Sequence, residues 1–320
     1  LSPSVLLSCY WCLLGFALFC FLVERGSPPP LARVREDLDL ADAGAVQRFF
    51  TAERPDVVYL AAAKVGGILA NDTYRWDFLY QNLLIETSVL GAALESGVER
   101  VVFFGSSCIY PRLAPQPISE DALLTGPLEQ TNEPYAIAKI AGLKLVEAAN
   151  TQHGRKWVSL MPTNLYGPGD NFDLETSHVL PAMIRKFHEA KVAAQSGAPV
   201  PVVLWGTGAV QREFLHVDDL ALAALHVATS SVTGLINVGY GSDVTIRELA
   251  EIVSDAVGYQ GEVEWDTSKP DGSPRKLLDS GRIFETGWRP RIDLGTGVKT
   301  TYDGFLASSG VTGGVAAPIG

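Results

Sequence analysis

Short apolar runs alternate with longer amphipathic segments through the first half of the chain. Residues 56–63 and 100–105 have the composition of buried strands, and residues 76–96 between them have the spacing of an amphipathic helix. A further strand is predicted at 156–162, after a helix over 134–150. Because strands that alternate with helices form parallel sheets covered on both faces, we predict a doubly wound, Rossmann-like α/β fold. Its ligands should bind beyond the carboxyl ends of the strands.

The second half of the chain has longer loops and shorter elements. We predict a helix over 178–192, a strand over 202–205 and a helix that starts at His216. Residues 236–239 have the composition of a strand, and residues 245–248 have the spacing of a capping box. These elements are typical of a smaller α+β substrate domain.

These patterns divide the chain into three regions. Residues 1–22 form an atypical apolar segment, residues 23–168 a Rossmann-like nucleotide-binding domain, and residues 169–320 a substrate-binding domain. The sheet of the nucleotide-binding domain also receives parts of residues 209–245. A chain of 320 residues with 47% apolar residues is long and apolar enough for such a core.

Charge and cysteine content limit the function classes. The net charge of -11 argues against a nucleic-acid partner, because affinity for a phosphate backbone comes from clustered Lys and Arg. Four cysteines are too few to staple 320 residues, and Cys9, Cys12 and Cys20 lie in one apolar stretch. We therefore expect a reducing compartment and a cytoplasmic protein.

The first residues of the chain are unusually apolar. Residues 5–23 carry no charged side chain and have about the twenty-residue length that a helix needs to cross a bilayer. Taken alone, they predict a membrane span, and Arg25, Arg33 and Arg35 behind it would keep the rest of the chain in the cytoplasm. The chain starts with Leu1 rather than Met, which favours a fragment or an uncertain gene start.

A phenol and an ammonium are spaced for joint action. Tyr135 and Lys139 lie four residues apart, on one helix face. A free Tyr has a pKa of about 10, and a nearby cation can lower it. Upstream, the strand at 100–105 leads into Ser106, Ser107 and Cys108, where a parallel sheet presents its ligands. Such a group can move a proton to or from a carbonyl oxygen while hydride moves at the carbon.

Several segments together carry a resemblance to a known family. They are LAAAKVGG at 60–67, GSSCIYP at 105–111, TNEPYAIAK at 131–139, MPTNLYGP at 161–168, REFLHVDD at 212–219 and KPDGSPRK at 269–276. From about Val23 to about Phe305 the chain resembles the extended short-chain dehydrogenase/reductase superfamily. Within it, the chain is similar to the GDP-L-fucose synthase family of GDP-4-keto-6-deoxy-D-mannose 3,5-epimerase/4-reductases. The resemblance implies NADP as cofactor, a GDP-sugar substrate and a homodimer.

The resemblance implies a role for each catalytic residue. Tyr135 would protonate the C4 oxygen as NADPH delivers hydride, and Ser106 would hydrogen-bond the same oxygen. Lys139 would hold the nicotinamide ribose and lower the pKa of Tyr135. Cys108 and His178 would be the acid/base pair that epimerises C3 and C5. Proton loss there is feasible because the enolate charge moves onto the C4 oxygen.

The resemblance also implies binding residues. The GDP-sugar contacts would be Lys186, Trp205, Arg212 and Asp271. The NADP contacts would be Arg33 and Arg35 at the 2′-phosphate, Ala61, Ala62 and Ala63 at the adenine half, and Pro162, Thr163, Asn164 and Leu165 beside the nicotinamide, together with Gly105, Ser106, Ser107, Tyr135, Lys139 and His178. No metal site is predicted.

The N-terminus departs from the family pattern. The family opens with a strand and a G-x-x-G-x-x-G turn whose backbone amides receive the pyrophosphate. Here Gly15 and Gly26 are the only glycines before Gly44, and residues 1–21 take the place of the first strand, the turn and most of the first helix. The prolines at 28–30 also suit the start of a second strand poorly.

Three interpretations follow. In the first, the N-terminal residues are a mis-spliced or frame-shifted substitute in an otherwise ordinary soluble enzyme. In the second, the chain is a membrane-anchored or truncated homologue that binds GDP-sugars without a working cofactor site. In the third, it is a sugar-nucleotide 4,6-dehydratase, although that class typically has acidic residues where this chain has Ser107 and Cys108.

Overall fold

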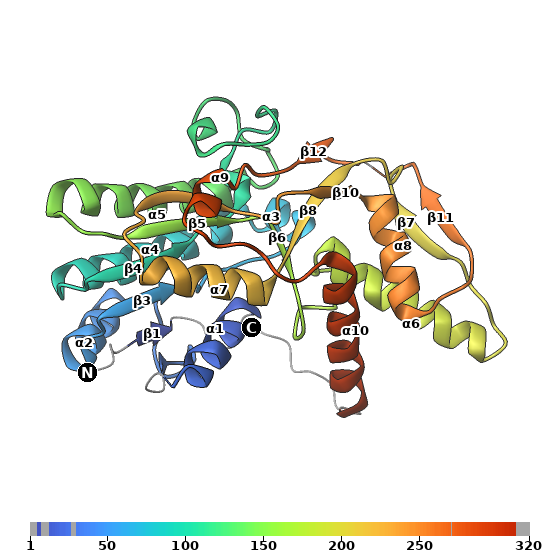
Figure 1. Ribbon diagram of the computed structural model, residues 1–320, viewed down its shortest axis with the longest axis horizontal. Coiled ribbons are helices and arrows are strands. Elements are labelled where there is room, and N and C mark those ends of the chain that lie inside the picture. Colours follow the sequence, from blue (N-terminus) through green and yellow to red (C-terminus); the bar gives the residue numbers. More distant parts are fainter. Residues whose placement is uncertain (1–4, 8–12, 27–29, 270, 312–320) are drawn as a thin grey trace.

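A six-stranded parallel sheet forms the centre of the first half of the chain (Figure 1). The computed structural model describes residues 5–7, 13–26, 30–269 and 271–311. The strand order is β2-β1-β3-β4-β5-β9. The strands are β1 (Val5–Leu7), β2 (Leu31–Ala32), β3 (Val57–Leu60), β4 (Arg100–Phe104), β5 (Val158–Pro162) and β9 (Gly234–Val238).

Helices cover both faces of this sheet, as the doubly wound prediction requires (Figure 1). One face carries α2 (Ala43–Glu53), α4 (Arg75–Glu95) and α5 (Glu133–His153). The other face carries α1 (Leu13–Glu24) and α7 (Val217–Ala228). Every residue of β4 and β5 is buried, which explains why both read as continuous apolar runs. The predicted fold class is confirmed.

A second lobe is built on smaller sheets. Strand β8 (Gln211–His216) lies between β10 (Asp243–Thr245) and β12 (Arg275–Lys276) and also pairs with β6 (Asn164–Tyr166), while β7 (Val202–Trp205) pairs with β11 (Val263–Asp266). The helices packed here are α6 (Val179–Gln195), α8 (Ile246–Val257) and α10 (Leu294–Val311). Short helices α3 (Ile68–Thr73) and α9 (Gly281–Glu285) complete the fold. The capping box predicted at 245–248 opens α8.

The N-terminal segment belongs to the sheet, so the predicted membrane span at 5–23 is wrong. The segment divides into β1 and the twelve-residue helix α1, and β1 pairs with both β2 and β3. Leu14, Leu18 and Leu22 of α1 are buried in the apolar cluster that includes α7, which accounts for the hydropathy of this helix. None of the described helices is long and apolar enough to cross a membrane.

The structure leaves two N-terminal expectations partly open. Residues 8–12, where the family pattern places its Gly-rich turn, and residues 27–29, with two of the three prolines, lie outside the described residues. A second strand does form, although β2 has only two residues and follows Pro30 directly. A strand this short is consistent with the lack of an N–H donor on proline.

Candidate active site

The end of β4 presents a serine and a cysteine. The Gly105 amide donates to the Leu160 carbonyl (2.9 Å), and a Cβ at position 105 would lie 2.2 Å from the side chain of Met161. A larger residue at position 105 would therefore have to displace the end of the Met161 side chain. Ser106 then caps the short 3-10 helix η1 (Ser107–Ile109), where its Oγ accepts from the Cys108 amide at 3.4 Å. This turn places both side chains at the carboxyl edge of the sheet.

Helix α5 supplies Tyr135 and Lys139 at the same edge. Lys139 is only 2% exposed, and its Nζ lies 3.1 Å from Oε1 of Glu86 on α4. The ammonium also lies 5.0 Å from the ring centroid of Phe103 and 5.8 Å from that of Tyr135. The predicted pair is thus confirmed as neighbours, but the lysine has a second, carboxylate partner.

The pKa of Tyr135 is raised, contrary to the expected lowering by Lys139. Burial disfavours the phenolate, and the charges of Cys108 and Glu86 disfavour it further, so the pKa lies well above its ordinary value. Burial is the main physical reason, and the Glu86 carboxylate adds to it because it compensates the ammonium that was expected to stabilise the phenolate. In this structure Tyr135 is a neutral phenol at pH 7.

The pKa values of Cys108 and His178 are shifted in opposite directions. Burial raises the pKa of the Cys108 thiol, although the nearby charge of Lys276 and a hydrogen bond with Ser106 oppose that effect. His178 precedes α6, and its side chain is exposed. The protein atoms around it nevertheless desolvate the imidazolium and lower the pKa of the imidazole. A protonated thiol and a neutral imidazole are therefore available together at pH 7.

The loop at 64–67 connects the surroundings of Tyr135 with the segment before His178. Asn82 of α4 is fully buried and clamps Lys64, accepting from its amide at 2.8 Å and donating to its carbonyl at 3.0 Å. The Phe78 ring packs edge-on against Tyr135, with centroids 6.3 Å apart. At the far end of the loop, a Cβ at Gly67 would lie 3.5 Å from the carbonyl oxygens of residues 176 and 177.

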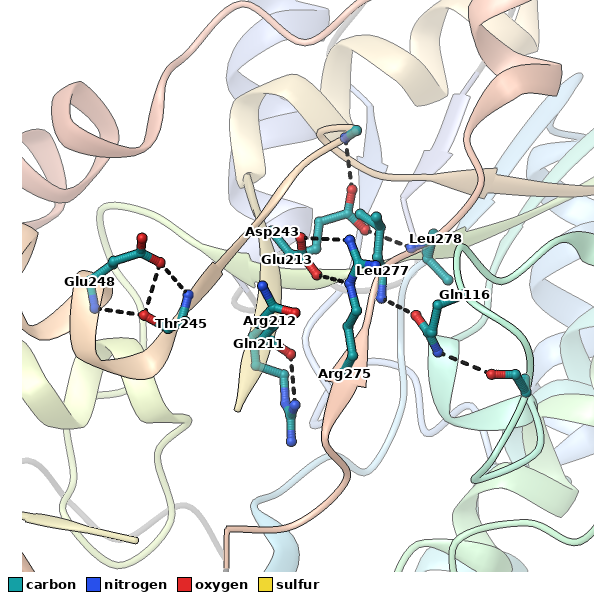
Figure 2. A network of polar contacts seen from close by, with 12 residues as sticks. Gln116, Gln211, Arg212, Glu213, Asp243, Thr245, Glu248, Arg275, Leu277 and Leu278 are labelled. Atoms are coloured by element: carbon teal, nitrogen blue, oxygen red, sulfur yellow. Dashed lines mark hydrogen bonds and ion pairs between the residues drawn. The ribbon is translucent and has the colours of Figure 1, made fainter. Parts of the chain in front are cut away.

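A polar network joins β8, which carries the predicted GDP-sugar contact Arg212, to β10 and β12 (Figure 2). Fully buried Glu213 accepts from the amides of Gly241 (2.8 Å) and Leu278 (3.1 Å). Arg275 holds Asp243 through two hydrogen bonds of 2.5 and 3.0 Å. These contacts fix β8, β10 and β12 side by side, with Arg212 opposite Lys276 in the register.

The predicted GDP-sugar residues lie around β7 and β8. Arg212 is attracted to Asp271, whose carboxylate accepts from the amide (2.7 Å) and hydroxyl (2.9 Å) of Thr207. Trp205 is 66% exposed, and the Lys269 ammonium lies 5.4 Å from the centroid of its ring. Lys186 lies on α6, and its Nζ donates to the Val203 carbonyl of β7 at 2.9 Å. Burial lowers the pKa of both Arg212 and Lys186.

Several of the predicted cofactor residues follow the carboxyl ends of β2, β3, β4 and β5, whereas Tyr135 and Lys139 lie on α5 and His178 precedes α6. Arg33 and Arg35 are exposed after β2, where Arg33 lies 3.5 Å from Glu53. Residues 61–63 follow β3, and the Asn164 amide group after β5 donates to the Glu213 carbonyl at 2.8 Å. An ammonium, hydroxyls and a guanidinium at one sheet edge are donors that suit the ribose and phosphate groups of a nicotinamide dinucleotide.

Sequence reasoning missed Glu86, Asn82 and Glu213. A signal for the first two was present: within the predicted helix 76–96 they share the buried face with Phe78, where apolar side chains are expected. A charge or amide at such a position is buried only with a polar partner. The partner itself lies on another element and cannot be read from the helix pattern.

Comparisons with known proteins agree with this geometry. GDP-L-fucose synthase from Escherichia coli (strain K12) is 53% identical over 304 residues, which cover 92% of this chain and 94% of that protein. Probable GDP-L-fucose synthase 1 from Oryza sativa subsp. japonica is 54% identical, over 92% of this chain and 89% of that protein. Among solved structures, a GDP-mannoheptose C4 reductase from Campylobacter jejuni with NADP bound is similar, with a TM-score of 0.88 and 35% identity, and covers 96% of this chain and 99% of that chain. Residues 20–239 match the NAD dependent epimerase/dehydratase family, and the chain belongs to that family.

Proposed function

We propose that the chain catalyses the NADPH-dependent 3,5-epimerisation and 4-reduction of GDP-4-keto-6-deoxy-D-mannose to GDP-L-fucose. The observation that carries the proposal is the gathering of Ser106, Cys108, Tyr135 and Lys139 at one sheet edge. Relatives named GDP-L-fucose synthase support it, since their identity to this chain exceeds 50% over nine-tenths of its length.

Epimerisation requires a base and an acid near C3 and C5 of the sugar. The protons on these carbons are acidic because the charge of the enolate moves onto the C4 oxygen, where Tyr135 and Ser106 can donate hydrogen bonds. His178, as a neutral imidazole, takes the proton from one face. Cys108, as a protonated thiol, returns a proton to the other face, and the centre is inverted.

Reduction requires a proton at the C4 oxygen. NADPH, when bound, supplies the hydride to C4. Tyr135 donates its phenolic proton to the oxygen, and its raised pKa keeps it in the form that can donate. Lys139 would hold the nicotinamide ribose, and Arg33 and Arg35 would hold the adenosine 2′-phosphate, which favours NADP over NAD.

The second lobe holds the GDP part of the substrate. Arg212 binds a diphosphate oxygen, and Trp205 packs its exposed indole on a ring of the ligand. Lys186 and Asp271 complete this side of the site. We further propose that the chain is cytoplasmic, because its cysteine content suits a reducing compartment. We also propose a homodimer, because members of the superfamily that the chain resembles commonly dimerise through paired helices.

A non-catalytic GDP-sugar-binding homologue is the second candidate. The observation that favours it is the sequence Ser-Cys-Tyr-Trp-Cys at 8–12, which has no glycine between β1 and α1. The backbone of a dinucleotide-binding turn usually relies on glycine to approach the pyrophosphate.

Cofactor titration and product analysis decide between these functions. The full chain is titrated with NADPH while cofactor fluorescence is followed, and then supplied with GDP-4-keto-6-deoxy-D-mannose. We expect saturable binding and formation of GDP-L-fucose. Absence of NADPH binding to the folded chain would establish the non-catalytic homologue, and dehydration of GDP-mannose would identify a 4,6-dehydratase instead.

A further inference from the structure

A buried carboxylate lies against the catalytic lysine. Glu86 is 1% exposed and Lys139 2% exposed, with 3.1 Å between carboxylate and ammonium. The contact is an ion pair: burial raises the pKa of the Glu86 carboxyl, and the charge of Lys139, a hydrogen bond from it and the Gly142 amide oppose that effect. Burying two charges costs desolvation free energy, and an apolar pair of similar volume often stabilises a protein equally well. Stability alone therefore does not account for this pair.

The space around the Glu86 carboxylate is shaped by its neighbours. A Cβ at Gly142 of α5 would lie 2.7 Å from Glu86 Oε2 and 2.6 Å from the Phe103 ring. Any larger residue at position 142 would displace the carboxylate or the ring. The same Phe103 ring lies 5.0 Å from the Lys139 ammonium. Glycine, aromatic ring and carboxylate together hold the ammonium in the interior, one helical turn from Tyr135.

The charge of the pair bears on the reacting phenol. Tyr135 is faced by Cys108 from η1 and by Glu86 from α4. Burial raises its pKa most, and the charges of the Cys108 thiolate, once that forms, and of Glu86 raise it further. Lys139 lies on its own helix, with Nζ 5.8 Å from the phenol ring. Lys276 from β12 faces Cys108 in turn. A lone ammonium beside the phenol would stabilise the phenolate, whereas a compensated ammonium does so much less.

Resting on the proposed function, we propose that Glu86 is a positioning residue that holds and compensates Lys139, so that Tyr135 stays a neutral proton donor. The proton balance follows directly. Tyr135 gives its proton to the C4 oxygen as the oxygen gains charge, and the phenolate regains a proton from solvent. Glu86 thereby suits the site to reduction, which starts from a phenol, rather than to oxidation, which starts from a phenolate.

The test is a titration of Tyr135 in the full chain, without sugar or cofactor. Glu86→Gln keeps the side-chain volume and removes the charge. We expect the Tyr135 phenolate to appear at about tenfold lower hydroxide concentration, one unit of pKa. Near-ultraviolet phenolate absorbance measures it, with Tyr135→Phe variants subtracted to isolate this tyrosine. The alkaline limb of the pH profile of sugar reduction should move in the same direction.

Matched variants separate charge compensation from folding. Glu86→Asp keeps the charge, so Tyr135 should ionise at the same pH as in the parent chain. Glu86→Gln combined with Lys139→Met removes both charges, so the ionisation of Tyr135 should again stay at that high pH. If Glu86→Gln does not fold, Gly142→Ala takes its place. This variant pushes the carboxylate aside and should lower the pH at which Tyr135 ionises by a smaller amount. An unchanged Tyr135 transition in a folded Glu86→Gln or Gly142→Ala chain would refute the proposal. Because the titration needs no substrate, it stands apart from any failure of the proposed sugar chemistry.

Discussion

The two faces of the central sheet are built on different principles. On one face α1 packs on α7 through aliphatic side chains such as Leu14 and Leu18. On the other face the contact between α4 and α5 contains the Glu86–Lys139 ion pair, and buried Asn82 holds a loop beside it. The first face needs only apolar side chains at helical spacing. The second needs particular polar groups within hydrogen-bond or ion-pair distance of one another. An unusual N-terminal sequence is therefore compatible with the fold, whereas the residues of the site tolerate few substitutions.

The largest effect is expected from the phenol itself. Tyr135→Phe removes the proton donor for the C4 oxygen and should lower the rate of reduction by about 10²–10⁴-fold. Some solvent-deuterium exchange at C3 should remain, because proton removal there does not require this group. Mass spectrometry of the sugar in D₂O measures exchange, and NADPH absorbance measures reduction. Equal loss of both activities would contradict the assigned role.

Cys108→Ser should reverse that pattern. The alcohol is a far weaker acid than the thiol, so exchange at C3 and C5 should fall by about 10²-fold. Reduction of an already epimerised 4-keto sugar should persist, because Ser106 and Tyr135 are untouched. The same D₂O assay reads the result, and unchanged exchange would remove Cys108 from the epimerisation.

Lys139→Met tests the polar face through stability. The substitution leaves the Glu86 carboxylate buried without its cation, and breaking a buried pair costs about 3–5 kcal/mol. Urea unfolding of the full chain measures the loss. Adding Glu86→Gln should recover much of the loss, because both charges are then gone. No recovery in the double variant would mean that packing, rather than the unpaired charge, is responsible.

Leu18→Ala tests the apolar face. Leu18 is fully buried between α1 and α7, so its truncation should cost about 2–5 kcal/mol through lost burial and the cavity left behind. Leu18→Met, which conserves volume, should cost less than about 1.5 kcal/mol. Urea unfolding compares the two variants. A small effect of Leu18→Ala would show that α1 contributes little to the folded state.

Val23→Lys should have the smallest effect of the series. Val23 lies near the end of α1 and is 46% exposed, so a charged side chain there can remain in water. The free energy of unfolding should change by less than about 0.5 kcal/mol. A large destabilisation would mean that this end of the helix is covered by something other than solvent.

Local patterns predicted most of the fold, because buried parallel strands are continuous apolar runs and the helices between them are long. The gathering of Ser106, Cys108, Tyr135 and Lys139 also followed, since adjacent parallel strands end at one edge. Hydropathy failed at residues 5–23, because a strand and a helix that pack into the core can together be as apolar as a membrane span, even though Phe16 and Val23 of this helix are exposed. The sequence patterns also predicted the wrong direction for the pKa of Tyr135, because burial and the charges contributed by other elements, Glu86 among them, appear only in the fold.

The pairing of β9 with β5 limits how the molecule can be divided. These neighbours are separated in sequence by β6, α6, β7, β8 and α7, so the chain leaves the sheet, builds much of the second lobe and then returns. A fragment that ended near residue 168 would lack β9 and α7, and the buried leucines of α1 would face water. The sheet of the first lobe is therefore discontinuous in sequence, and a cut of the chain near residue 168 removes one of its strands.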